Sequence, residues 1–265
     1  MQRNYELLKE VLSIPTVTYQ EELMIEFIIN WLKENKIPFV VDQHWNIYAT
    51  KETGENPEGF YFPCVVAHTD TVHPIENINI REMELPNYQK VLKPSLKAFN
   101  DEGLPTGIGG DNKCGVYACL ELLKEMDNLK AAFFVSEETG CHGSRKADRH
   151  FFEDVGYVIQ FDAPFNWMVS EYSSGVKLFD KSDDFFKICD GVLTESFEGR
   201  QQYGSHPYTD VYALRSKFNF ACINISIGYY NYHTENEYVV VEDTMNGIET
   251  GKRMIEKLGN FRYTT

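Results

Sequence analysis

The sequence has few basic residues and no long hydrophobic run. Its 25 Lys and Arg residues are outnumbered by 40 Asp and Glu residues, which gives a formal net charge of -15. A chain this acidic repels the phosphates of nucleic acids and anionic membrane surfaces, so we expect neither as a partner. No apolar stretch approaches the roughly 20 residues that span a bilayer. Residues 1–10 alternate charged with apolar side chains, which is not the pattern of a secretory signal.

Cys-x-x-Cys spacing is also absent. The cysteines lie mostly inside apolar segments, at positions 64, 114, 119, 141, 189 and 222. This is not the pattern of a disulfide framework or of a cysteine-ligated zinc site, and it predicts reduced, buried thiols in a cytosolic protein. Cys141 follows two glutamates, but a small apolar filler is the preferred interpretation there too.

Segments of strand and helix character alternate through most of the chain. This pattern predicts one domain over residues 1–265, of the α/β class, with three layers (α/β/α) and a mixed, mainly parallel sheet. Helices are expected at residues 4–13, 20–35, 143–151, 183–189 and 207–216, and on the apolar positions 116, 119, 120 and 123 and 248, 251, 255 and 258. Strands are expected at residues 37–41, 45–49, 60–67, 131–135, 155–161, 167–169, 176–179 and 220–227, with two more within 77–99. In the second helix the predicted apolar stripe is Leu23, Phe27 and Trp31, widened by Ile28 and Leu32.

Side chains that can bind metals follow the ends of several predicted strands. In chain order they are His68, Asp70, Asp111, Glu137, Glu138, Asp162 and His233. Strand ends in open α/β sheets border the ligand crevice, so these side chains are expected to converge. Two histidines with several carboxylates suit zinc, manganese or cobalt better than calcium, which prefers an all-oxygen shell.

Five stretches around these residues resemble a known family, the co-catalytic di-zinc exopeptidases. They are AHTDTV at 67–72, GGDNKCG at 109–115, SEETG at 136–140, FD at 161–162 and HTENEYV at 233–239. Their order is that of the family, which includes glutamate carboxypeptidase, aminoacylase and tripeptide aminopeptidase (peptidase T). The resemblance covers residues 1–170 and 205–260, and the glycine loop is most similar to that of tripeptide aminopeptidase.

The resemblance implies a site for two divalent metal ions, with zinc as first choice and manganese or cobalt as alternatives. It implies that His68 and Asp162 bind one ion, that Glu138 and His233 bind the other, and that Asp111 bridges them.

The resemblance also implies roles for two acids that bind no metal. Glu137 is expected to act as general base toward the attacking water and then as general acid toward the leaving amine. Asp70 is expected to orient the imidazole of His68. A cis peptide is expected between Asp111 and Asn112.

In one respect the sequence departs from the family. Most members insert a small lid domain after the residue equivalent to Asp162, and this domain dimerises, covers the site and supplies a histidine for the oxyanion and a carboxylate-binding arginine. Here only two short strand-like segments precede the helix near residue 183. We therefore expect an open site and a monomer or weak oligomer.

Several residues are candidates for the substrate pocket. His206 and Asp210 lie in a turn where the family lines its pocket, and His206 either replaces the lid histidine or is an exposed loop residue. Arg200 either binds a substrate carboxylate or is solvated. Tyrosines 229, 230 and 232 either form a pocket wall or pack in the core. The remaining histidines, at 44, 73, 142 and 150, are interpreted as structural or exposed.

These features predict metal-dependent hydrolysis of peptide bonds by an exopeptidase, with an aminopeptidase acting on short peptides as the first choice. A deacylase of N-acyl amino acids is the alternative within the enzymes. A non-catalytic relic that binds peptides is the alternative from another class.

Overall fold

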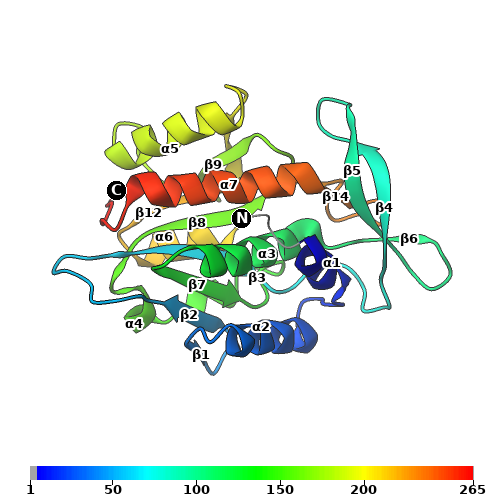
Figure 1. The fold of residues 1–265 in the computed structure, drawn as a ribbon, viewed down its shortest axis with the longest axis horizontal. Helices are drawn as coiled ribbons and strands as arrows, with labels where there is room; N and C mark the ends of the chain where they lie inside the picture. The colour runs from blue at the N-terminus through cyan, green and yellow to red at the C-terminus, as the bar shows by residue number, and fades with distance from the viewer. Residues whose placement is uncertain (1–4, 265) are drawn as a thin grey trace.

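A nine-stranded mixed sheet forms the centre of the protein, shown in a computed structural model that describes residues 5–264 (Figure 1). Its strand order is β1-β2-β7-β3-β8-β12-β9-β10, and β11 pairs with β9. The bounds are β1 Phe39–Val41, β2 Ile47–Lys51, β3 Phe62–His68, β7 Leu129–Phe134, β8 Val155–Ala163, β9 Met168–Ser173, β10 Val176–Lys177, β11 Gln202–His206 and β12 Ala221–Ser226. The neighbours β7, β3, β8 and β12 are parallel, and the antiparallel pairs lie outside them. The carboxyl ends of these four strands therefore meet at one edge.

Helices cover both faces of the sheet. In Figure 1, α3 (Gly110–Glu125) and α7 (Val241–Leu258) lie in front of the central strands and α6 (Asp210–Lys217) lies behind β8. Every residue of β3, β7, β8 and β12 is buried, which explains their continuous apolar character, because a strand covered on both faces has no solvent side. The predicted α/β class and layer order are confirmed.

The remaining helices pack around these layers. They are α1 (Tyr5–Ser13), α2 (Glu22–Glu34), α4 (Arg149–Phe152) and α5 (Asp184–Ser196). α1 packs on α3, and α5 packs on α7. The first predicted helix is confirmed from Tyr5, while position 4 lies outside the described residues. Within residues 5–264, no helix is both long and apolar enough to cross a bilayer.

A second, smaller sheet was not predicted as a separate unit. It contains β4 (Asn79–Pro86), β5 (Leu92–Phe99), β6 (Pro105–Thr106), β13 (Tyr229–Tyr230) and β14 (Tyr238–Val240). β4 and β5 form the hairpin at the side of the molecule in Figure 1. β14 pairs with β5 from a distant part of the chain. Strands of two or three residues carry too little periodicity to be read from sequence, and their pairing depends on tertiary contacts.

Two details of the predicted helices were wrong. The helix expected at 143–151 is a 3-10 turn, η1 (Ser144–Lys146), followed by α4, because Ala147 is extended and Asp148 starts a new helix by accepting a hydrogen bond from the amide of His150. In α2, Leu23 is 53% exposed rather than part of the apolar stripe. The buried face is centred on Ile28, and at 3.6 residues per turn Leu23 lies about 140° away from it.

The predicted burial of the thiols is confirmed. All six cysteines are buried and unpaired, including Cys141.

Candidate metal centre

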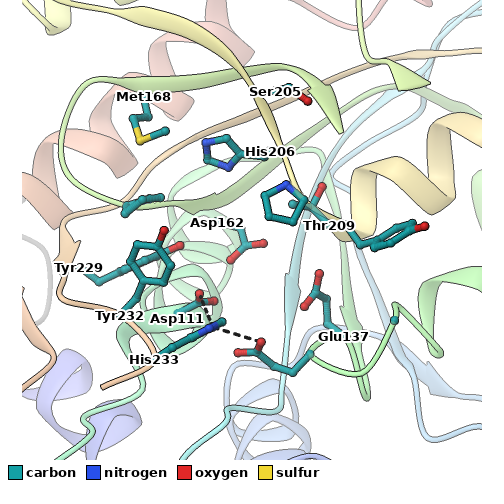
Figure 2. Close-up of a pocket in the computed structure, with 15 residues that line it drawn as sticks. Asp111, Glu137, Asp162, Met168, Ser205, His206, Thr209, Tyr229, Tyr232 and His233 are labelled. Atoms are coloured by element: carbon teal, nitrogen blue, oxygen red, sulfur yellow. Dashed lines mark ion pairs between the residues drawn. The ribbon is translucent and has the colours of Figure 1, made fainter. Parts of the chain in front are cut away.

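The predicted metal ligands come together at the carboxyl edge of the central strands. His68 ends β3 and Asp162 lies near the end of β8. Glu138 follows β7, Asp111 lies in the first turn of α3, and His233 follows β13. Figure 2 shows Asp111, Asp162 and His233 around one pocket.

Two groups of three side chains share one carboxylate. The first group is His68, Asp111 and Asp162, in which His68 Nε2 lies 3.2 Å from Asp111 Oδ1 and 3.5 Å from Asp162 Oδ1. The second is Asp111, Glu138 and His233, in which His233 Nε2 lies 3.3 Å from Asp111 Oδ2 and 3.2 Å from Glu138 Oε2 (dashed in Figure 2). Asp111 thus directs one carboxylate oxygen to each group, which is the arrangement of a bridging ligand.

The charges of these groups fit two cations. Asp162 Oδ1 and Glu138 Oε1 are buried without a hydrogen-bond partner. Burial and the charge of Asp111 raise the pKa of Asp162 well above its usual range, and burial also raises the pKa of Glu138. Burial opposes ionisation of Asp111 as well, but hydrogen bonds from His233 and His68 hold its pKa below the usual range. Buried, crowded carboxylates with free lone pairs are stabilised by metal ions, and the mixed His and carboxylate set suits zinc, manganese or cobalt.

Asp70 is fully buried and contacts both the metal ligands and the glutamate pair. His68 Nδ1 lies 3.1 Å from the backbone oxygen of Asp70 and 3.3 Å from its Oδ1, so Nδ1 faces acceptors and Nε2 faces the other ligands. The Asp70 carboxylate also accepts hydrogen bonds from the backbone amides of Glu137, at 2.9 Å, and Glu138, at 3.2 Å. The same residue therefore orients the imidazole and fixes the loop after β7.

Glu137 lines the pocket but belongs to neither group of three. Its Oε2 lies 3.8 Å from His68 Nε2, farther than the carboxylates of Asp111 and Asp162. Burial raises the pKa of Glu137 well above its usual range, the charge of His68 lowers it, and neighbouring acids raise it further. Glu137 is therefore an acid that lies beside the two groups of three and belongs to neither.

Known proteins have a similar fold. The fold is similar to that of the aminopeptidase PepT of Bacillus cereus, with a TM-score of 0.76 and 12% identity over 96% of this chain and 97% of that one. A tripeptidase of Staphylococcus aureus gives a TM-score of 0.73 and 11% identity over 97% and 99%. The chain has the fold of the co-catalytic metallo-exopeptidases.

In sequence, the resemblance is more distant. The chain is 24% identical over 144 residues to the cytosol non-specific dipeptidase of Escherichia coli, which is 53% of this chain and 29% of the relative. The match thus spans less than a third of that relative's length. No family model matches the sequence. The predicted resemblance to metallo-exopeptidases holds in distant sequence similarity and in fold.

Within this metallo-exopeptidase fold, the pocket beside the metal groups is a cavity of about 390 Å³. Its walls include Pro164, Met168, Tyr229 and Tyr232, besides the acids and histidines of the centre. Tyr230 points elsewhere and donates a hydrogen bond to Asp243 Oδ2 at 2.6 Å. Tyr229 and Tyr232 therefore form part of the pocket wall, whereas Tyr230 packs away from it.

Of the three predicted pocket residues, His206, Asp210 and Arg200, only His206 is a lining residue of the pocket. His206 lines the pocket, and its Nε2 is buried without a hydrogen-bond partner. Burial lowers the pKa of His206. Asp210 is fully buried behind the pocket, where Gln160 Nε2 lies 3.4 Å from Asp210 Oδ2 and 3.1 Å from Asp162 Oδ2. Arg200 is not among the lining residues, and its Nη2 lies 3.5 Å from Glu198 Oε2.

Sequence reasoning missed the side chain that supports Asp111. Glu237 is fully buried and accepts hydrogen bonds from the amides of Gly109, at 3.0 Å, and Asp111, at 3.1 Å. His73 Nε2 lies 2.6 Å from Glu237 Oε2, so the structural interpretation of this histidine fits. Glu237 lies in the family-like stretch at 233–239, which was the available signal. The expected cis peptide between Asp111 and Asn112 is observed.

Proposed function

We propose that this protein is a two-metal hydrolase of peptide bonds that acts as an aminopeptidase on short peptides. The observation that carries the proposal is Asp111, which offers one oxygen to each of two His and carboxylate groups beside an unligated Glu137. The metallo-exopeptidase fold supports the same reaction class.

Each residue has a distinct part in the proposed mechanism. His68 and Asp162 would hold one ion, Glu138 and His233 would hold the other, and Asp111 would contribute an oxygen to each. When bound, divalent ions (zinc, or alternatively manganese or cobalt) would polarise the scissile carbonyl and lower the pKa of the attacking water.

Neither Glu137 nor Asp70 is proposed as a metal ligand: Glu137 would move the proton, and Asp70 would position Glu137 and His68. Glu137 accepts the proton of the attacking water and then gives it to the leaving amine nitrogen. A raised pKa suits this second step, because the acid must hold the proton until the C–N bond breaks. Asp70 keeps Glu137 in place by accepting a hydrogen bond from its backbone amide.

The lining of the pocket favours an aminopeptidase over the deacylase alternative. Among the described residues that line it, none is Lys or Arg. An N-acyl amino acid or a dipeptide carries a free carboxylate close to the scissile bond, and the described pocket lining offers no Lys or Arg side chain to bind it. A longer peptide places its carboxylate farther away. We therefore expect tripeptides and aminoacyl anilides to be cleaved faster than N-acetyl amino acids.

One assay tests the function. Wild-type protein and Glu137→Gln, both loaded with zinc, are compared on leucine p-nitroanilide, a tripeptide and N-acetyl-leucine. We expect wild-type turnover of the first two and a loss of about 100-fold or more in the variant, the range of general acid–base catalysis. If both proteins are equally inert with metal bound, the peptide-binding relic is the better interpretation.

His206 is proposed to replace the lid histidine. His206 lines the pocket and its Nε2 has no hydrogen-bond partner among the described residues, and a neutral imidazole can donate a hydrogen bond to the carbonyl oxygen as charge develops there. Asp210 is assigned a supporting role, through Gln160, at Asp162. If His206→Ala retains kcat within a few-fold of wild type on leucine p-nitroanilide, the role of His206 is wrong.

The proposed setting follows from the same features. Buried, unpaired thiols and a relative described as a cytosolic enzyme support a cytoplasmic location. The proposed substrates are short peptides, and no nucleic acid or membrane partner is proposed for a chain of net charge -15.

A further inference from the structure

Residues 16–21, which we call the strap, connect α1 to α2 and cross the loops that carry the candidate metal centre. The chain turns tightly here, since Val17 and Gln20 form an isolated bridge and Tyr19 has a φ of 70°. None of the strap residues belongs to the two groups of three or to the pocket lining. The strap instead contacts two segments far apart in the sequence, residues 68–71 and residues 136–139.

On the first segment, the strap binds both the backbone and the carboxylate of the loop after β3. Thr16 Oγ1 donates to the backbone oxygen of Thr69 at 2.8 Å, and Thr71 Oγ1 donates back to the oxygen of Thr16 at 2.6 Å. Thr18 Oγ1 donates to Asp70 Oδ2 at 2.7 Å. That same carboxylate oxygen accepts the amide of Glu138. Thr18 is thus linked to the backbone of a proposed metal ligand by two hydrogen bonds that share one carboxylate oxygen.

On the second segment, the strap fixes the residue before Glu137. Glu21 Oε1 accepts a hydrogen bond from the amide of Ser136 at 2.7 Å. Ser136 has a φ of 54°, in the left-handed region that residues other than glycine adopt only at an energetic cost. A hydrogen bond to a carboxyl group is among the stronger ways to hold such a conformation. Tyr19 adds a contact on the far side of the pair, with its hydroxyl 3.2 Å from Thr139 Oγ1.

Capping of α2 does not explain the side chain of Glu21. Glu21 is the N-cap residue of α2, but its side chain makes no cap hydrogen bond. Its carboxyl group is instead turned toward Ser136 and is 6% exposed. Burial raises the pKa of Glu21 to about 7, and the nearby charge of Asp70 raises it as well. A buried acid is costly in free energy, which argues for a function in its contact with Ser136 rather than in local helix formation.

We propose that Glu21 and Thr18 are positioning residues that hold the Glu137–Glu138 loop against the metal centre. The strap ties together the segment that carries His68 and Asp70 and the segment that carries the glutamate pair. The proposal rests on the proposed function in that it assigns the loop to catalysis. Outer partners of metal ligands typically change metal affinity or activity by about 10- to 100-fold when removed.

The test uses Glu21→Ala and Thr18→Val, with Glu22→Gln as the matched control because Glu22 is the neighbouring residue and is exposed. Metal-free proteins are titrated with zinc chloride by calorimetry, and kinetics are measured on leucine p-nitroanilide. We expect Glu21→Ala and Thr18→Val to bind zinc more weakly and to lose about 10-fold or more in kcat, with KM within about 3-fold. Glu21→Gln should recover most of the loss, because its amide oxygen still accepts from Ser136. Glu22→Gln should match wild type.

The proposal is overturned if zinc affinity and kcat of both strap variants equal those of Glu22→Gln. It is also overturned if Glu21→Gln is as impaired as Glu21→Ala, since the acceptor would then not matter. If Glu21→Ala fails to fold, Thr18→Val decides alone, because it keeps the size of the side chain and removes only the hydroxyl. If the wild type cleaves no peptide, the proposed function fails while the zinc titration still decides the role of the strap.

Discussion

At the scale of single residues, we propose that two adjacent glutamates have different roles, Glu138 as a metal ligand and Glu137 as a proton carrier. Glu138 Oε2 lies 3.2 Å from His233 Nε2, within the second group of three, whereas Glu137 belongs to neither group. β7 ends before this pair of glutamates, and the Asp70 carboxylate accepts a hydrogen bond from the backbone amide of each. Neighbouring side chains that would point to opposite faces of a strand therefore reach the same pocket.

This division predicts different metal contents for two variants. Glu138→Ala should lose one of two zinc ions per chain, because only Asp111 and His233 would remain in its group. Glu137→Gln should keep both ions. The measurement is elemental analysis after equilibration with limiting zinc and gel filtration. Two ions retained by Glu138→Ala would contradict the assignment of Glu138 as a ligand.

The candidate ligands could be predicted from sequence because each follows an apolar strand or a glycine loop in an order that resembles a family. The supporting residues could not. These residues, Glu21, Thr18 and Glu237, form hydrogen bonds with residues far away in the sequence. Ser136, for example, lies 115 residues after its partner Glu21. No local pattern marks a side chain for such a contact.

At the scale of elements, the position of Asp162 depends on how closely α7 approaches β8. Gly251 of α7 faces the ring of Phe161, and a Cβ there would lie 2.4 Å from its Cζ. Gly251→Ala should therefore lower the free energy of unfolding by about 1–3 kcal/mol, as for other overpacked cores.

Gly191 gives the matched control for this prediction. It is exposed in α5, and a Cβ there would meet no atom within 4 Å. Gly191→Ala should stabilise the protein by about 0.5–1 kcal/mol, because alanine restricts the unfolded chain and favours helix. Urea unfolding of both variants measures the difference. The same sign for both substitutions would show that the contact with Phe161 is not what requires glycine at 251.

The elements themselves differ in how well sequence predicts them. The buried central strands were predicted from their continuous apolar runs, and α7 was predicted from its helical apolar periodicity. The split between η1 and α4 was not, since it depends on the extended backbone of Ala147 and the cap at Asp148. The small sheet depends on β14 reaching β5 across the chain.

At the scale of the whole molecule, the expected lack of a lid domain predicts a monomer or weak oligomer. A compact domain of 265 residues has a radius of gyration of about 18 Å. Small-angle scattering and light scattering should give this radius with a mass near 30.7 kDa. A mass of twice that value at micromolar concentration would contradict the expectation and would call for a partner surface.

The stability of the whole molecule should also depend on the metals. The native state gathers buried acids whose pKa values are raised by burial, whereas the unfolded chain disperses them. Ions that bind only the native state at 100 times their Kd stabilise it by about 2.7 kcal/mol. For a chain of this size that corresponds to roughly 5–10 °C in Tm, since each kcal/mol shifts Tm by about 2–4 °C. Chelation with EDTA should therefore lower the Tm of the zinc-loaded protein by about 5 °C or more.

A variant without the shared carboxylate separates this effect from unspecific action of the chelator. Asp111→Ala removes an oxygen from each group of three, so it should bind neither ion tightly and its Tm should not respond to EDTA. Glu22→Gln should respond like wild type, because Glu22 is exposed outside both groups. The decisive comparison is the EDTA shift of wild type minus that of Asp111→Ala. If the two shifts are equal although elemental analysis shows that zinc was removed from the wild type, the ions do not bind through Asp111 and the bridged arrangement is wrong.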